Sequence, residues 1–340
     1  MPEHEIRVLF ICKIRNDFYG PSFGLINSCR FIANALREEG IECKIASVID
    51  NNDIDKEVYL FKPTHVFIEA LWVVPPKFEE LIPLHPKVQW YVRIHSKIPF
   101  LASEGIAIEW LRDYYKLSKL YQQFHIASNS DEVVETLKLA YNMKVGYFPN
   151  IYYPEDYEIQ LEDDKEESRK IVHIGCFGAI RPMKNQLNQA LAAIVFGNEK
   201  GLKIHFNINS DRCETGGDPV LRNLIHAFKD THHKLICNPW MDHKDFIKVV
   251  RRMDLGMQVS MSETFNIVAA DFVWNDIALI GSEEIDWLDR RYKANPNSVE
   301  SMVDKLRFAY AGRRYNTQKV NLENLEKYNK RALRTWLNAL

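Results

Sequence analysis

Two carboxylates stand in an otherwise mostly apolar stretch of the sequence. Glu263 and Asp271 are the only acidic residues between position 263 and Trp274, a segment that is predicted to be helical. On a helix their side chains would lie about 80° apart around the axis and about 12 Å apart along it. Glu263 would sit at the helix N-terminus, where a carboxylate is favourable, whereas Asp271 would lie among apolar residues and need a partner. The pair is interpreted either as ligand-binding groups or as an N-terminal helix cap plus one carboxylate at a solvent-exposed edge of the helix.

A loop with two cations precedes this segment in the chain. The run IGCFGAIRPMKN, residues 174–185, is predicted to form a strand, a loop containing Gly178 and the start of a helix. Arg181 and Lys184 lie directly before that helix. Cations and backbone N–H groups at a helix N-terminus stabilise a diphosphate on which negative charge develops. We therefore interpret both as phosphate-binding residues; the alternative is a pair of ordinary surface cations.

The first half of the chain offers further candidates. Residues 18–24, FYGPSFG, follow the first predicted strand, and glycines such as Gly24 allow a backbone to approach a ligand closely, although an ordinary turn is an equal alternative. His95 ends a predicted strand, and the carboxyl ends of parallel strands face the crevice where such sheets bind ligands. A lone histidine is more often structural. The loop that follows contains Lys97 and Glu104, two further polar candidates.

Strand and helix patterns alternate along the chain, which predicts parallel α/β sheets covered on both faces. An acidic, apolar-poor stretch at residues 154–170 interrupts the alternation, as a solvated linker would. The expected domains are 1–152, a linker at 153–169, a second domain at 170–315, and a helical segment at 316–340. The expected strands are 7–12, 42–48, 65–71, 88–95, 124–128, 144–148, 170–177, 203–209, 234–237, a short strand within 254–262 that runs into a Ser-rich turn, and 277–282. The expected helices are 23–39, 77–84, 106–117, 131–141, 186–196, 219–229, 244–253, 263–274 and the segment 298–340.

Composition excludes several classes of protein. The chain has 340 residues, of which 46% are hydrophobic and 26% charged, as in globular proteins, and no segment is apolar enough to cross a membrane. The first residues lack the features of a signal peptide, so we expect a cytoplasmic protein. The six cysteines are widely spaced, which favours reduced core thiols over disulfides or zinc ligands. A net charge of −2 provides no global attraction to nucleic acid or anionic lipid.

No metal site is expected from the sequence. The adjacent histidines His232 and His233, and His243 further along, lack carboxylates at ligand spacing. We therefore expect that any diphosphate is bound by cations of the protein itself, without a divalent ion.

The order of these motifs resembles the donor-binding domain of retaining, nucleotide-sugar-dependent glycosyltransferases with the GT-B fold, of the family-4 type. That family has a Gly-Arg…Lys loop followed by a Glu-x7-Glu helix. Here Ala179 stands where the family usually has its arginine, with Arg181 two positions later, and Asp271 replaces the second glutamate. The resemblance implies two doubly wound Rossmann-like domains that face a central cleft. It also implies a C-terminal helix, about 322–340, that returns to the N-terminal domain through Leu333, Trp336 and Leu340.

The resemblance also implies roles for the candidate residues. Glu263 would accept hydrogen bonds from the hydroxyls of the donor sugar, Asp271 would bind the ribose, and His95 would contact the sugar near the reacting carbon. The donor would be a substrate, a uridine or guanosine diphosphate sugar, and no cofactor is implied. The residues expected at the site are His95, Lys184, Arg181 and Glu263 in catalysis, Gly24, Gly178, Thr264, Phe265, Asn266 and Asp271 in donor binding, and Lys97 and Glu104 on the acceptor side.

The implied reaction is transfer of the sugar to an acceptor hydroxyl with retention at the anomeric carbon, by same-face attack assisted by the leaving phosphate. The acceptor stays open between a glycan, a lipid-linked sugar and a modified DNA base, and no stable membrane insertion is expected. One alternative is a viral-type enzyme that glycosylates a hydroxymethylated base in DNA, for which arginine-rich pairs such as Arg251-Arg252 and Arg313-Arg314 would contact phosphates. Another is a GT-B-like sugar or nucleotide binder without turnover, which the departures at Ala179 and Asp271 keep open.

Overall fold

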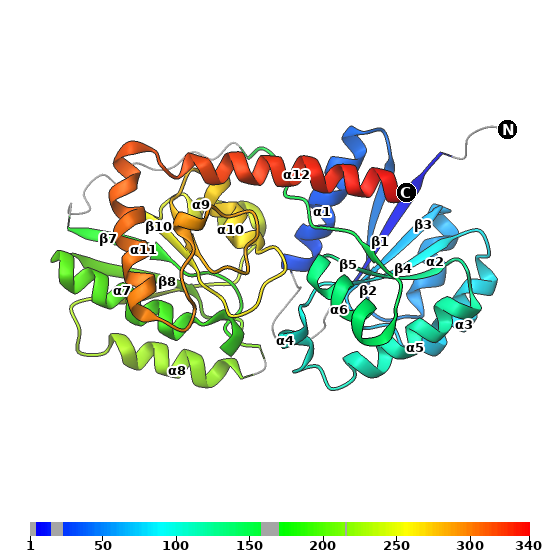
Figure 1. The fold of residues 1–340 in the computed structure, drawn as a ribbon, viewed down its shortest axis with the longest axis horizontal. Coiled ribbons are helices and arrows are strands. Elements are labelled where there is room, and N and C mark those ends of the chain that lie inside the picture. The colour runs from blue at the N-terminus through cyan, green and yellow to red at the C-terminus, as the bar shows by residue number, and fades with distance from the viewer. Residues whose placement is uncertain (1–4, 15–22, 158–169, 215) are drawn as a thin grey trace. The chain divides into compact units, whose positions relative to one another are not determined.

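The protein divides into two compact units. The computed structural model describes residues 5–14, 23–157, 170–214 and 216–340. Unit 1 comprises Met1–Pro154 together with Tyr328–Leu340, and unit 2 comprises Glu155–Lys327. Each unit is built on its own parallel sheet with flanking helices (Figure 1). The expectation of two doubly wound Rossmann-like sheets is therefore confirmed.

The sheet of unit 1 has six parallel strands in the order β2-β1-β3-β4-β5-β6. The interior strands β1 and β3 are buried at nearly every position, which explains why they read as continuous apolar runs rather than alternating ones. The strands are β1 (Arg7–Lys13), β2 (Glu42–Val48), β3 (His65–Glu69), β4 (Gln89–Ile94), β5 (Phe124–Ser128) and β6 (Val145–Tyr147), and the helices are α1 (Phe23–Glu38), α2 (Asp53–Phe61), α3 (Pro75–Leu84), α4 (Ile98–Leu101), α5 (Ala107–Leu120) and α6 (Asp131–Tyr141).

The sheet of unit 2 has five parallel strands in the order β11-β10-β7-β8-β9. Its strands are β7 (Ile171–Gly175), β8 (Lys203–Asn209), β9 (Lys234–Asn238), β10 (Leu255–Gln258) and β11 (Leu279–Gly281). Its helices are α7 (Gln186–Lys200), α8 (Gly217–Phe228), α9 (His243–Val250), α10 (Ile267–Trp274) and α11 (Val299–Gly312), with short 3-10 turns η1 (Pro182–Lys184), η2 (Arg290–Tyr292) and η3 (Arg313–Tyr315).

The helix α12 (Lys319–Ala339) begins in unit 2, and its last turns belong to unit 1. The expected return of the C-terminal helix is therefore confirmed. Trp336 is fully buried in unit 1, where its indole N–H donates to the carbonyl of Pro149 at 2.8 Å. Asn329 bonds both the backbone N–H (3.0 Å) and the carbonyl (2.8 Å) of Tyr152. A side chain that satisfies both polar groups of one residue fixes the register of the helix on the unit.

The expected helix over residues 263–274 is wrong at its N-terminal end, because α10 begins only at Ile267. Asn266 adopts a left-handed conformation with φ 63°, and its side chain accepts a hydrogen bond from the N–H of Ala269 at 2.9 Å. Asparagine tolerates this conformation and is a preferred N-cap residue. Glu263 therefore lies in the loop before the helix, and the helical spacing to Asp271 does not apply.

Acid should destabilise unit 1 through His65. Burial, with a smaller effect of nearby His125, lowers the pKa of His65 to about 4. An unfolded histidine binds a proton near pH 6.5, so between about pH 6.5 and 4 the unfolded chain binds more protons and stability falls as pH falls. The loss reaches at most about 3 kcal/mol. The free energy of unfolding in urea should be measured for wild type and His65→Gln at about pH 7 and 4.5. Between these pH values it should fall less in the variant than in wild type. Equal decreases in the two proteins would contradict the role of His65.

Candidate functional site

The strand order of unit 2 creates a switch point between β7 and β10. From β7 the chain continues through α7 to β8 on one side, whereas β10 pairs on the other side of β7. Ligands of open α/β sheets bind outside the carboxyl ends of strands at such a point. The loops that leave β7 and β10 are bonded together there, by Met261 N–H to the carbonyl of Met183 (2.9 Å) and by the Asn185 side chain to the carbonyl of Val259 (3.1 Å).

Lys184 and Glu263, which are 79 residues apart in the chain, form an ion pair at this switch point. The Lys184 Nζ lies 2.5 Å from a carboxylate oxygen of Glu263, and the two side chains are 13% and 8% exposed. Gly178 stands beside the lysine in a backbone conformation with φ +115° that favours glycine, and a Cβ there would lie 3.9 Å from Lys184 Cε. Of the predicted donor residues, the structure thus brings Gly178, Lys184 and Glu263 together.

Arg181 points to a different carboxylate. Its guanidinium pairs with Glu214 at 2.6 Å, and Glu214 also pairs with Arg212 at 3.2 Å. Glu214 follows β8 in the chain, and the two segments are joined by the bond from Ile180 N–H to the carbonyl of Arg212. Arg181 is therefore held by the loop after β8, and its role toward a diphosphate stays a prediction.

The loop between Glu263 and α10 is stabilised by its own side chains. Phe265 is buried, and its carbonyl accepts the indole N–H of Trp287 at 3.1 Å. The Asn266 amide donates to the Gln258 side chain at 3.0 Å while its oxygen caps α10. Thr264, which precedes Phe265, is half-buried. These residues fix the conformation of the loop that carries Glu263; their contact with a donor stays a prediction.

Asp271 has the partner that its apolar surroundings require. Its side chain is 2% exposed, and one oxygen lies 2.8 Å from Nε2 of His243. The other imidazole nitrogen, Nδ1, lies 3.1 Å from the hydroxyl of Tyr157. His243 begins α9, directly after the N-cap Asp242. The sequence singled out both His243 and Asp271, but not their contact, because the two residues are 28 positions apart in the chain. The predicted contact of Asp271 with a ribose is not tested by this arrangement.

In unit 1, His95 directly follows β4 and contacts a buried carboxylate. Its Nε2 is hydrogen-bonded to Glu69, the last residue of β3, and Glu69 also pairs with Arg93 at 2.9 Å. Glu69 and Arg93 are both fully buried. Burial alone would raise the pKa of Glu69, but Arg93 and His95 together lower it below its usual value. Burial lowers the pKa of His95, and Glu69 only partly opposes this. Sequence reasoning missed Glu69 and Arg93, which read as ordinary strand residues.

The remaining predicted residues of unit 1 lie on surrounding segments. Lys97 precedes α4 and pairs with Glu132 at 2.9 Å. Glu104 is half-buried, and its carbonyl accepts the N–H of Ala107. Gly24 lies in the first turn of α1, where a Cβ would meet no atom within 4 Å. The rest of the predicted glycine loop, residues 18–22, lies outside the described residues.

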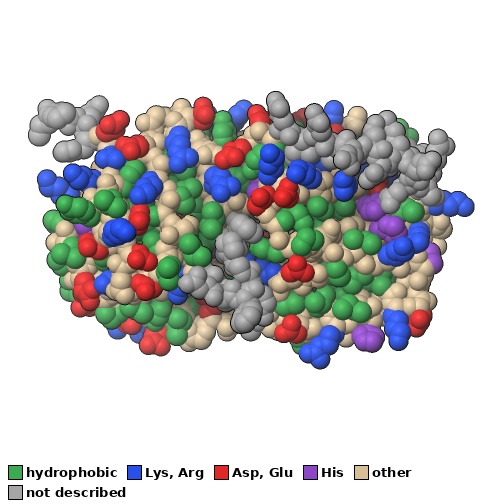
Figure 2. Space-filling view, turned by 180° about the vertical axis from the view of Figure 1, so that it is seen from behind, with side chains coloured by type: hydrophobic (Ala, Val, Ile, Leu, Met, Phe, Trp, Pro, Cys, Tyr) green, Lys and Arg blue, Asp and Glu red, His purple; other side chains and the backbone are tan. Residues whose placement is uncertain are grey.

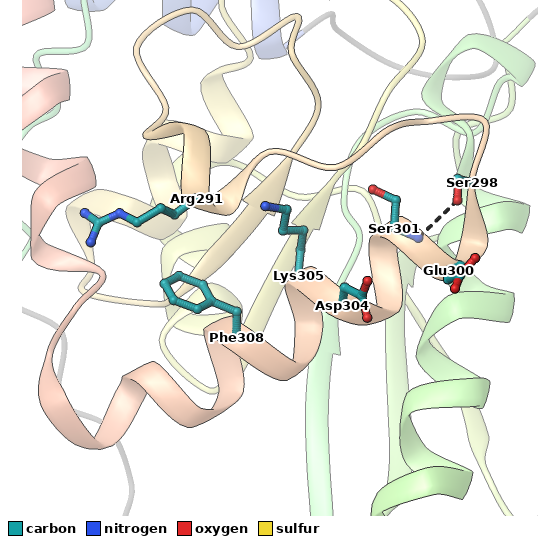
Figure 3. A pocket seen from close by; sticks show the side chains of 7 residues that line it. All are labelled: Arg291, Ser298, Glu300, Ser301, Asp304, Lys305 and Phe308. Carbon is teal, nitrogen blue, oxygen red and sulfur yellow. Dashed lines mark hydrogen bonds between the residues drawn. The ribbon is translucent and has the colours of Figure 1, made fainter.

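A separate cavity of about 460 Å³ opens on unit 2 beside α11 (Figure 3). In Figure 3 the Arg291 and Phe308 side chains lie at the end away from Ser298 and Glu300, and Lys305 lies between the two groups. None of the residues predicted for the donor or acceptor lines it; it is lined by Arg291, Ser298, Glu300, Ser301, Asp304, Lys305 and Phe308.

One further feature of the sequence has a local explanation. The Asp-x-Asp triplet Asp53-Ile54-Asp55 begins α2, where Asp53 accepts from Ile49 N–H at 3.1 Å and Asp55 pairs with His85 at 2.7 Å. Among the residues that the structure describes, no group of three or more His, Cys, Asp or Glu side chains is arranged to hold a metal ion. Within the same residues, no helix combines the length and apolar character that a membrane span requires.

Comparisons with known proteins identify the fold. No protein-family model matches the sequence, and no curated protein matches it. A glycosyltransferase from Rickettsia africae superposes with a TM-score of 0.66 at 12% identity, over 99% of this chain and 98% of its own. Anabaena Alr3699/HepE in complex with UDP and glucose gives 0.63 at 10% identity, over 98% and 100%. A trehalose-6-phosphate synthase studied for glycosyl transfer with retention gives 0.57 at 13%, over 85% and 76%. With its two parallel Rossmann-like sheets and returning C-terminal helix, the chain has the GT-B fold.

Proposed function

We propose that this protein is a glycosyltransferase that moves a sugar from a nucleoside diphosphate donor to an acceptor hydroxyl with retention. The observation that carries the proposal is the ion pair of Lys184 and Glu263 at the β7/β10 switch point. A cation and a carboxylate in one small region match the two ends of such a donor, which presents an anionic diphosphate next to neutral hydroxyls.

The chemistry assigns each side chain a task. When the bond between the anomeric carbon and the phosphate oxygen breaks, negative charge grows on the diphosphate, and Lys184 stabilises it. The N-terminus of α7, directly after Lys184, adds backbone dipoles of the same sign. Glu263 accepts hydrogen bonds from sugar hydroxyls. In the ligand-free protein these two charges neutralise each other, so the donor replaces an existing ion pair rather than finding two isolated charges.

The structural neighbours agree with this proposal. The Anabaena protein was solved with UDP and glucose, and the trehalose-6-phosphate synthase was studied as an enzyme that transfers a glycosyl group with retention. Retention and a uridine or guanosine diphosphate sugar are therefore proposed for this chain as well. Fold similarity alone does not select the acceptor.

The alternative acceptor, a base in DNA, has less support. Two of the arginines expected to contact phosphates instead contact protein groups: Arg251 binds Asn275 (2.7 Å), and Arg313 binds Asp254 (2.6 Å). Cationic and anionic side chains are interspersed on the face that Figure 2 shows, rather than gathered by sign. A duplex-binding surface instead concentrates positive charge.

A donor screen tests the proposal directly. Uridine, guanosine and adenosine diphosphate sugars should be compared by thermal shift and by release of the free nucleotide. A donor at about 100 times its Kd should stabilise the protein by about 2.7 kcal/mol. Lys184→Ala should lose that shift, which is measured from the melting temperature of the same variant without donor. If none of the sugar nucleotides raises the melting temperature or is turned over, the proposal is wrong.

Transfer should proceed without a divalent metal. Lys184 and the N-terminus of α7 already supply positive charge where a bound Mg²⁺ would act, so removal of metal ions should leave kcat within about twofold. The measurement is donor turnover in excess EDTA, with and without added Mg²⁺ or Mn²⁺. Activity that disappears in EDTA and returns with Mn²⁺ would place an ion in the mechanism.

A further inference from the structure

Three polar side chains, those of Glu69, Arg93 and His95, lie together at the carboxyl ends of strands β3 and β4 in unit 1. Glu69 and Arg93 are partners in the register of β3 and β4, and His95 lies two residues beyond Arg93, directly after the end of β4. The end of β3 is held by further bonds, from Ala70 N–H to the carbonyl of Arg93 (3.0 Å) and from the Trp72 indole to the carbonyl of Glu69 (3.0 Å).

Arg93 is anchored on several sides. Its Nε donates to the carbonyl of Phe148 (2.8 Å), its Nη2 to the side chain of Asn150 (2.5 Å) and its Nη1 to Glu69 (2.9 Å). The guanidinium also lies 5.4 Å from the centre of the Trp336 ring. The cation and its carboxylate are therefore held in one geometry before any ligand binds.

Stability alone does not account for this group. Replacing a buried ion pair with well-packed apolar residues is often neutral or stabilising, because two charges have lost their hydration. One oxygen of Glu69, Oε2, serves both Arg93 and His95, whereas the other, Oε1, is buried without a hydrogen-bond partner. An arrangement with such a cost is expected where a side chain must be oriented for function.

The contact between Glu69 and His95 determines which imidazole nitrogen carries the proton. The lowered pKa of Glu69 keeps it ionised, and an ionised carboxylate can only accept a hydrogen bond. Nε2 of His95 must therefore be the donor. The lowered pKa of His95 favours the neutral ring, in which the other nitrogen, Nδ1, is an acceptor. Arg93 Nη1, 3.3 Å from Nε2, cannot also donate to a nitrogen that bears a proton.

We infer that Glu69, itself fixed by Arg93, is a positioning residue that holds His95 as the Nε2–H tautomer, so that Nδ1 accepts a hydrogen bond from a hydroxyl of the substrate. The inference rests on the proposed function, because it assigns the substrate contact of His95 to a sugar transfer. Glu69 acts only through His95. The side chain of His95 is 14% exposed, whereas that of Glu69 is fully buried.

¹⁵N NMR of the whole chain labelled with ¹⁵N-histidine measures the tautomer of His95, and it does not depend on enzymatic activity. The His95 signals are assigned by their absence in His95→Asn. In wild type at neutral pH, Nε2 should have the shift of a protonated nitrogen and Nδ1 that of an unprotonated one. In Glu69→Gln the amide can turn its N–H toward Nε2, so the two shifts should exchange. A wild-type spectrum with the proton on Nδ1 would overturn the inference.

Transfer kinetics provide the second test. Glu69→Gln should lower kcat/KM about tenfold, the size expected when an acceptor is replaced by a mismatched donor. Glu69→Asp, which keeps the charge, should retain more activity than Glu69→Gln. The matched control is Glu80→Gln, which removes an exposed carboxylate of the same unit and should leave kcat/KM unchanged. Wild-type kcat/KM in Glu69→Gln would contradict the role.

A pair of His95 variants avoids any risk that Glu69→Gln fails to fold. An asparagine amide reaches the position of Nδ1, whereas a glutamine amide reaches that of Nε2. His95→Asn should therefore retain about tenfold more activity than His95→Gln; the reverse order would overturn the inference. If wild type turns over no sugar nucleotide, the proposed function fails, and the NMR result alone still decides the tautomer. If wild type does turn over a sugar nucleotide, a proton on Nδ1 of His95 contradicts the role given to Glu69 but not the proposed function.

Discussion

Replacing Lys184 with alanine should lower kcat by about 10²- to 10³-fold, or about 3–4 kcal/mol in the barrier. Lys184 forms the ion pair with Glu263 at the β7/β10 switch point, and in the proposed function its charge stabilises the leaving diphosphate. Because that charge is greater in the transition state than in the bound donor, the loss should appear mainly in kcat rather than in KM. The measurement is steady-state turnover of the donor found in the screen.

Controls separate catalysis from stability. Lys248→Ala removes a lysine that likewise contacts a carboxylate, Asp245 at 2.6 Å, but on the exposed side of α9, and it should keep wild-type kcat. Lys184→Ala leaves Glu263, 8% exposed, without its partner, so some stability is also lost. The double variant Lys184→Ala with Glu263→Gln should recover that stability but no activity. If Lys184→Ala retains wild-type turnover, the lysine does not stabilise the diphosphate.

The parallel sheets could be predicted because their strands carry the signal within short segments. A strand buried on both faces, such as β3, is apolar at successive positions, and a helix between such strands implies a crossover and a parallel pair. The same order placed Lys184 and Glu263 in two segments that each follow a strand of one sheet. Their meeting followed from topology, because the carboxyl ends of parallel strands lie at one edge.

Features that depend on one residue's backbone or on a distant partner could not be predicted in this way. The start of α10 was misplaced because Asn266 takes a left-handed conformation and caps the helix after Glu263. The helix α2 was missed because only Ile54 and Val58 are buried in it, which is too weak a periodic pattern. The contact of His95 with Glu69 was missed because neighbouring strands, not neighbouring residues, bring it about.

Trp336→Ala should be the most destabilising single change in the C-terminal helix, at about 3–5 kcal/mol. The ring is fully buried, and its centre lies 4.8 Å from that of Phe148, 4.9 Å from Phe67 and 5.8 Å from Phe10. Deleting it leaves a cavity among these rings and removes the indole hydrogen bond to Pro149. The measurement is the free energy of unfolding in urea, at constant m-value.

Two variants resolve what the tryptophan contributes. Trp336→Phe keeps most of the ring contacts but leaves the carbonyl of Pro149 without its donor, which should cost about 1–3 kcal/mol. Asn338→Ala, at an exposed position of the same helix, should change stability by less than about 0.5 kcal/mol. Because Arg93 lies against the Trp336 ring, Trp336→Ala should also loosen the group that orients His95. A Trp336→Ala protein as stable as Asn338→Ala would mean that the helix end does not depend on this docking contact.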